Sequence, residues 1–194
     1  MIKMIMMLAL LISCGKKEES THVSAADVQQ KEEALSESAF KVKIKTVNFS
    51  ATNKSKVLKA AELIRQVVNS EEFRNEILDG RFTDTMGMTN LEIYEKIMSG
   101  AEVLSPKKDQ KMDLVLETFY ADIITVGYTM TGSPTIYMNT KFLNRQNAVQ
   151  VTTNLMHEWL HKIGFKHDEE FTPSRSSSVP YAVGYIVRRL AQEL

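Results

Sequence analysis

The stretch HEWLHKIGFKH, residues 157–167, contains three of the four histidines in this chain of 194 residues. His157 and His161 are four residues apart, and residues at that spacing lie on the same face of a helix. Gly164 comes next, and glycine often ends a helix because it readily adopts a positive φ. The stretch therefore predicts a helix, a sharp turn, and a chain that returns toward the helix with His167.

Three imidazoles brought together in this way form a set of metal ligands. They leave one position of a tetrahedral metal open, which is the pattern of catalytic rather than structural zinc sites. Glu158 points about 100° away from His157 around the helix axis, so it is placed beside the metal and not on it. We therefore expect Zn²⁺ on His157, His161 and His167, with Glu158 as the general base of the reaction.

The full spacing, His-Glu-x-x-His-x-x-Gly-x-x-His, resembles the zinc-binding signature of the metzincin metallopeptidases. Phe165, after the glycine, and Asp168, after the third histidine, also fit that signature. The resemblance implies a zinc-dependent endopeptidase that hydrolyses peptide bonds with a metal-activated water and takes a protein or peptide as substrate. It also implies an edge strand above the active-site helix.

One feature of the metzincins is missing. They carry a methionine in a tight turn below the metal, whereas the last methionine here is Met156, before the first ligand. Residues 178–181 resemble that turn, with Pro180 where the methionine is expected. Tyr181 follows, and in some metzincins a tyrosine here stabilises the developing oxyanion, a role that suits a phenol donor. Packing at the start of a helix is the alternative for Tyr181.

Two other functions use the same ligands. One is a non-catalytic zinc-binding envelope lipoprotein, which would need the histidines but not Glu158. The other is a zinc amidase or deacetylase that acts on a substrate other than a peptide. The presence of Glu158 favours a hydrolase over the binding module.

The N-terminus predicts a lipid anchor. Residues 1–13 carry one positive charge followed by an apolar run too short to span a bilayer, as in a signal peptide. Residues 11–14, Leu-Ile-Ser-Cys, resemble a bacterial lipobox. The resemblance implies that Cys14, the only cysteine, is acylated and holds the chain on an envelope membrane, with Gly15 favouring the outer membrane. A cleaved signal that happens to contain a cysteine is the alternative.

Composition and length indicate which other functions are excluded and how the domain is organised. The formal net charge is zero, which gives no electrostatic footprint of a nucleic-acid-binding protein. Residues 14–39 are charged and lack aromatic residues, so they predict a disordered tether after the lipidated cysteine. Residues 40–194 are long enough for one catalytic domain with its own core.

Periodicity and capping residues predict the elements of that domain. They are a strand at 41–47, a helix capped by Ser55 that reaches about Leu78, a helix at 91–98 between Thr89 and Gly100, strand pieces at 114–116 and 123–126, a strand at 135–139, and helices at 147–163 and from about 179 onward. This order indicates an α+β fold, with a twisted mixed sheet backed by helices. Pro134 favours an edge position for strand 135–139, where an extended substrate would pair with Asn139 and its neighbours.

Overall fold

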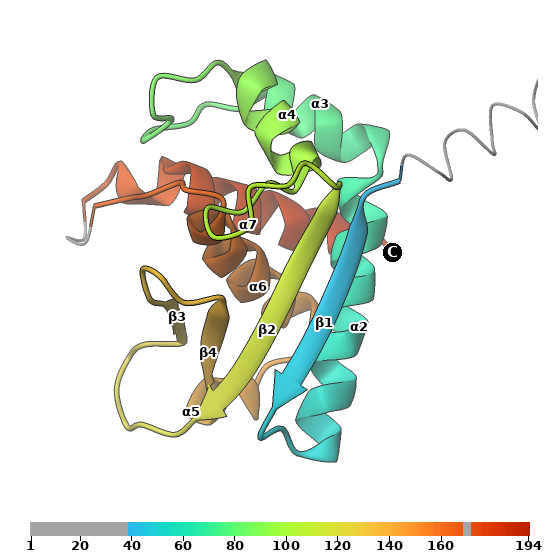
Figure 1. Ribbon diagram of the computed structural model, residues 1–194, viewed down its shortest axis with the longest axis vertical. Coiled ribbons are helices and arrows are strands. Elements are labelled where there is room, and N and C mark those ends of the chain that lie inside the picture. Colours follow the sequence, from blue (N-terminus) through green and yellow to red (C-terminus); the bar gives the residue numbers. More distant parts are fainter. Residues whose placement is uncertain (1–38, 169–171) are drawn as a thin grey trace, which may run out of the picture. The chain divides into compact units, whose positions relative to one another are not determined.

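The computed structural model describes residues 39–168 and 172–194 (Figure 1). The predicted signal peptide, Cys14 and almost all of the predicted tether lie outside the described residues. Among the described helices, none has the length and apolar character needed to cross a bilayer.

A four-stranded mixed sheet forms one layer of the domain. β1 (Lys41–Val47), β2 (Lys111–Phe119) and β4 (Thr135–Asn139) are parallel, and β3 (Gly127–Thr129) runs antiparallel to β4. The strand order is β1-β2-β4-β3. Along β2, every second residue from Met112 to Leu116 is buried, so this face of the sheet packs on the core.

Helices cover that face of the sheet (Figure 1). They are α2 (Ala51–Val68), α6 (Ala148–Lys162) and α7 (Val179–Ala191). The other helices are α3 (Glu71–Asp79) and α4 (Asn90–Ser99), which pack on each other beyond one end of the strands, α5 (Thr140–Leu143), which directly follows β4, and a short 3₁₀ helix η1 at Arg175–Ser177. Trp159 of α6 lies fully buried in the core, with its ring edge-on to Phe40 at 5.7 Å between centroids. The α+β class and the mixed sheet are therefore as the sequence predicts.

The predicted long helix after β1 is wrong in two places. It begins at Ala51, because the Ser50 side chain accepts a hydrogen bond from the Asn53 backbone, and Ser55 lies inside the helix. It also breaks after Val68. Asn69 turns its side chain to the backbone N–H and carbonyl of Phe40, and Ser70 then caps α3. Two capping residues thus divide one apolar pattern into two helices.

The predicted edge strand is also wrong. β4 pairs with β2 on one side and β3 on the other, so an extended substrate cannot add to it. Pro134 does not prevent this, because it precedes the first paired residue, Thr135. The edge strand on this side of the sheet is β3, which contacts α6.

The segment 123–126 forms a loop and not the strand that its apolar residues predict. The Asn139 side chain is fully buried and donates to the carbonyl oxygens of Ala121 and Thr125. The Asn139 backbone N–H donates to Val126 O. These loop carbonyls are thus bonded to Asn139. The predicted contact between Asn139 and a substrate is wrong, because these bonds occupy Asn139.

Candidate metal centre

The helix α6 carries the first two histidines. Asn147 and Gln150 form a capping box at its start, and Leu155, Trp159 and Leu160 bury its apolar side in the core. Because His157 and His161 are one turn apart, both project from the other side. The predicted helix is confirmed, and Trp159 and Leu160 pack it in the core.

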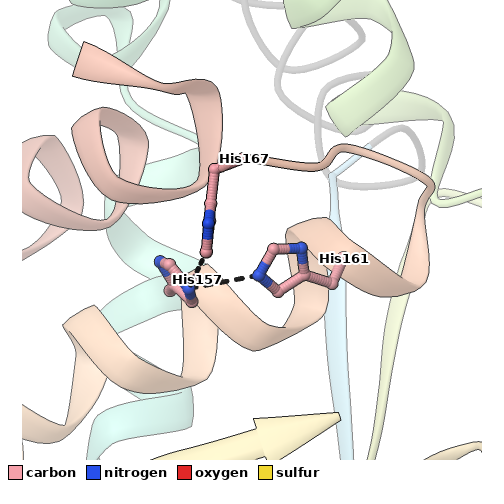
Figure 2. Close-up of side chains that lie close together, drawn as sticks. All are labelled: His157, His161 and His167. Carbon is pink, nitrogen blue, oxygen red and sulfur yellow. Dashed lines mark hydrogen bonds between the residues drawn. The ribbon is translucent and has the colours of Figure 1, made fainter. Parts of the chain in front are cut away.

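A turn at Gly164 returns the chain to this helix (Figure 2). Gly164 has φ +102°, a conformation that other residues rarely adopt. The backbone N–H of Phe165 donates to Leu160 O at 3.0 Å, and the Phe165 side chain is fully buried. These contacts fix the turn and bring His167 back over the helix, as the glycine predicts.

The three histidines converge (Figure 2). His157 Nε2 lies 3.2 Å from His161 Nε2 and 3.3 Å from His167 Nε2. One ligand atom from each ring lies within 4.8 Å of the other two. The structure therefore brings together the three ligands that the sequence predicts.

The second nitrogen of each ring is bound to the backbone. His161 Nδ1 donates to Phe165 O and His167 Nδ1 to Asp168 O, each at 2.8 Å. His157 forms a hydrogen bond with the backbone of Pro180, which has only a carbonyl to offer. Burial lowers the pKa of His157 to about 3, and it lowers that of His161 as well. The lowered pKa values keep the His157 and His161 rings neutral, with the proton on the backbone side and the Nε2 lone pair directed into the cluster.

This arrangement fits a metal ion. Lone pairs that face one another at 3.2–3.3 Å repel, and a cation between them removes the repulsion. Nitrogens about 2.0–2.1 Å from a tetrahedral zinc lie roughly 3.3 Å apart, which matches the observed spacing. Backbone acceptors on the second nitrogen are also usual for metal-binding histidines, because they fix the tautomer and the ring orientation.

Glu158 extends its side chain from α6 toward the edge strand β3. Its side chain is only 6% exposed, and burial raises its pKa to about 7. The Thr129 side chain of β3 faces the carboxylate and opposes that increase in pKa, although its hydroxyl oxygen lacks a partner at full hydrogen-bond geometry. Glu158 thus faces the edge strand β3, and its role as the general base stays a prediction.

Tyr181 also lies at the site. Its ring centroid is 4.3 Å from that of His157 and 4.9 Å from that of His167. The Arg175 guanidinium lies over the Tyr181 ring, 5.2 Å from the ring centroid. Pro180, in the first turn of α7, supplies the carbonyl bonded to His157. The turn at 178–181 thus supports His157 through the Pro180 carbonyl.

No match is found when the chain is compared with known protein families, curated proteins and solved structures. The functional assignment therefore rests on these residues and their geometry.

A buried ion pair that the sequence does not predict supports the ligand helix from behind. Glu102 accepts from Trp159 Nε1 at 2.8 Å and pairs with Lys162 Nζ at 3.0 Å. Both charged side chains are almost fully buried. Because Trp159 and Lys162 flank His161 in the chain, this pair holds the last turn of α6 in place.

The turn at Gly164 provides a test of how His167 is positioned. We expect Gly164→Ala to destabilise the metal-free protein by about 1–2 kcal/mol, because a side chain strains a positive φ, and to weaken metal binding through His167. Urea unfolding and metal titration would measure the two effects. Gly87→Ala is the matched control, since Gly87 has φ +79° in open space. It should lose stability but keep metal affinity; equal metal affinity in both variants would contradict the prediction.

Proposed function

We propose that this chain is a zinc-dependent endopeptidase of metzincin type. The observation that carries the proposal is the position of Glu158, a buried carboxylate on the ligand helix, next to His157 and directed at an edge strand. A protein that only binds metal needs the three histidines but has no use for a carboxylate held there. A hydrolase needs a base in this position.

Each residue then has a defined task. His157, His161 and His167 would hold the ion through Nε2, and their backbone partners keep them oriented. When bound, zinc supplies Lewis acidity, which polarises a substrate carbonyl and makes water more acidic. Glu158 accepts a proton from the attacking water and passes it to the amine nitrogen as the C–N bond breaks. The Tyr181 phenol is the candidate donor to the oxyanion that develops on the carbonyl oxygen.

The edge strand β3 supports a peptide as substrate. Only β4 pairs with it in the described residues, so its other side leaves backbone N–H and C=O groups for a further strand. An extended chain added there would pass Thr129, whose side chain faces Glu158. This corrects the predicted docking strand from β4 to β3 and keeps the predicted mode of binding.

The test of this proposal is metal analysis of the purified protein combined with a peptide-library cleavage assay. We expect about one zinc per chain, cleavage that stops on chelation, and recovery when zinc is added back. A protein that holds zinc but cleaves no peptide would be a binding module. Release of acetate from acetylated substrates without peptide cleavage would establish the deacetylase alternative.

We also propose that the enzyme is anchored to a bacterial envelope membrane through Cys14. The support is the Leu-Ile-Ser-Cys sequence at 11–14, preceded by a signal-like apolar run. Cys14→Ser should leave the membrane fraction or stay unprocessed, whereas the control Ser13→Ala, which keeps the cysteine, should fractionate like the parent. An unacylated N-terminus in the parent by mass spectrometry would contradict the anchor.

A further inference from the structure

Exposed apolar side chains gather around the edge strand. Five of the large ones occur in one short stretch, and we call them the apolar rim: Tyr120, Ile123, Ile124, Tyr128 and Met130. Ile124 and Tyr120 are 80% and 74% exposed. Scattered exposed apolar residues are ordinary, but five within eleven residues that lead into and out of an edge strand indicate an interaction surface.

The loop that carries the first half of the rim is held in place by specific bonds. Its backbone is bonded to the buried Asn139 side chain at Ala121 and Thr125. Lys141 Nζ donates to Ile123 O at 3.2 Å and pairs with Asp122 at 2.7 Å. The loop therefore holds its apolar side chains outward in a fixed arrangement, which lowers the entropy cost of binding to them.

The strand itself divides the rim from the reacting groups. Tyr128 lies on the face of the sheet away from the helices, stacked on Tyr137 at 4.9 Å and edge-on to Phe119 at 5.3 Å between ring centroids. Thr129, the next residue, points to the opposite face and Glu158. Met130 comes directly after the strand and is 47% exposed.

Charge and hydrogen bonding indicate what this surface binds. Residues 120–134 contain a single charged side chain, Asp122, which is paired with Lys141. A surface without free cations gives no attraction to anionic lipid headgroups. The unpaired edge of β3 offers main-chain hydrogen bonds, which a polypeptide can use and lipid tails cannot.

We propose that the apolar rim selects substrates with apolar side chains at alternate positions of an extended chain paired with β3. This inference rests on the proposed function and names the class of substrate. Side chains of the added strand that point away from the helices would pack on Tyr128 and Met130 as cross-strand neighbours. The side chains between them would point toward α6 and Glu158.

The test measures binding apart from cleavage. The full-length chain carrying Glu158→Gln is titrated against a short lysine-capped peptide of alternating valine and threonine, and against the same peptide with serine in place of valine. Met130→Ser and Ile124→Ser should each weaken binding of the valine peptide about fivefold, since each loses part of a buried apolar contact. Neither should alter binding of the serine peptide. The control Leu91→Ser removes a side chain from α4 that is as exposed as Met130 and should change neither.

Cleavage by the otherwise unchanged enzyme gives a second readout. Rim variants should raise KM for the valine peptide about fivefold and leave kcat unchanged, because they remove binding that is equal in ground and transition states. Equal affinity of the parent for both peptides would overturn the rim inference even if the enzyme cleaves both. The same rim variants are also tested in a Cys14→Ser chain for binding to phosphatidylcholine vesicles. If they weaken binding to the vesicles but not to the peptides, the surface is a membrane contact and the inference fails. An enzyme that cleaves nothing but still prefers the valine peptide would overturn only the proposed function.

Discussion

Glu158→Gln is expected to keep the fold and the metal while peptide hydrolysis falls by roughly 10²–10⁴-fold, the range typical of general base catalysis. Glutamine has the shape of glutamate and still forms hydrogen bonds, but it cannot accept the proton of the attacking water. The side chain is 6% exposed, so a neutral group is tolerated there at least as well as a carboxylate. Values of kcat and KM, with metal content measured on the same sample, would show the effect.

The control for this substitution is Glu102→Gln, the same change at another buried carboxylate next to α6. Glu102 pairs with Lys162 and accepts from Trp159, away from the reacting groups. Its loss should lower the free energy of unfolding, because Lys162 is left without its partner charge. With one metal ion bound per chain, it should lower kcat far less than Glu158→Gln does, because Glu102 supports the ligand helix but does not face the reacting groups. A Glu158→Gln enzyme that cleaves at the parental rate would exclude the general base role.

The metal ligands could be predicted because their arrangement depends on nearby residues. The spacing of His157 and His161 fixes their common face on a helix, and Gly164 permits the turn that returns His167. Each step needs only helix geometry and the conformational freedom of one glycine. The capping of α4 is a similar case. Thr89 and Glu92 form a capping box at its start, and Gly100 ends it with φ +68°.

The sheet order could not be predicted in the same way, because it depends on contacts between distant residues. Residues 123–126 are as apolar as a strand, but their backbone is bonded to Asn139. The strand forms instead at Gly127–Thr129, where a side chain on residue 127 would clash with the Asn154 side chain of α6. A short edge strand containing glycine gives almost no periodic signal of its own.

The supporting contacts of the site were missed for the same reason. Glu102 and Trp159 are 57 residues apart in sequence, and nothing near either of them indicates the contact. Thr129 of β3 faces Glu158 of α6, and only the folded protein brings these two elements together. Local patterns therefore predict which residues converge in the candidate metal centre, whereas the groups that support them appear only in the fold.

His161→Ala is expected to weaken metal binding by more than about 100-fold, since even loss of a supporting residue typically costs 10–100-fold. His161 supplies one of three converging Nε2 atoms, and the described residues bring no fourth His, Cys or acidic ligand into this cluster. The fold should persist without metal, because α6 is anchored by Trp159 and Leu160 in the core. Activity should be lost together with the metal.

Thermal unfolding with and without zinc separates a lost ligand from a damaged fold. A ligand that binds only the native state at about 100 times its Kd stabilises that state by about 2.7 kcal/mol. The parent should therefore melt at a higher temperature in zinc, whereas His161→Ala should melt at nearly the same temperature with and without it. His22→Ala, which removes the fourth histidine of the chain, should respond to zinc like the parent. If His161→Ala still gained full stabilisation from zinc, the ion would be held by other groups, and the three-histidine centre on which the peptidase proposal depends would have to be abandoned.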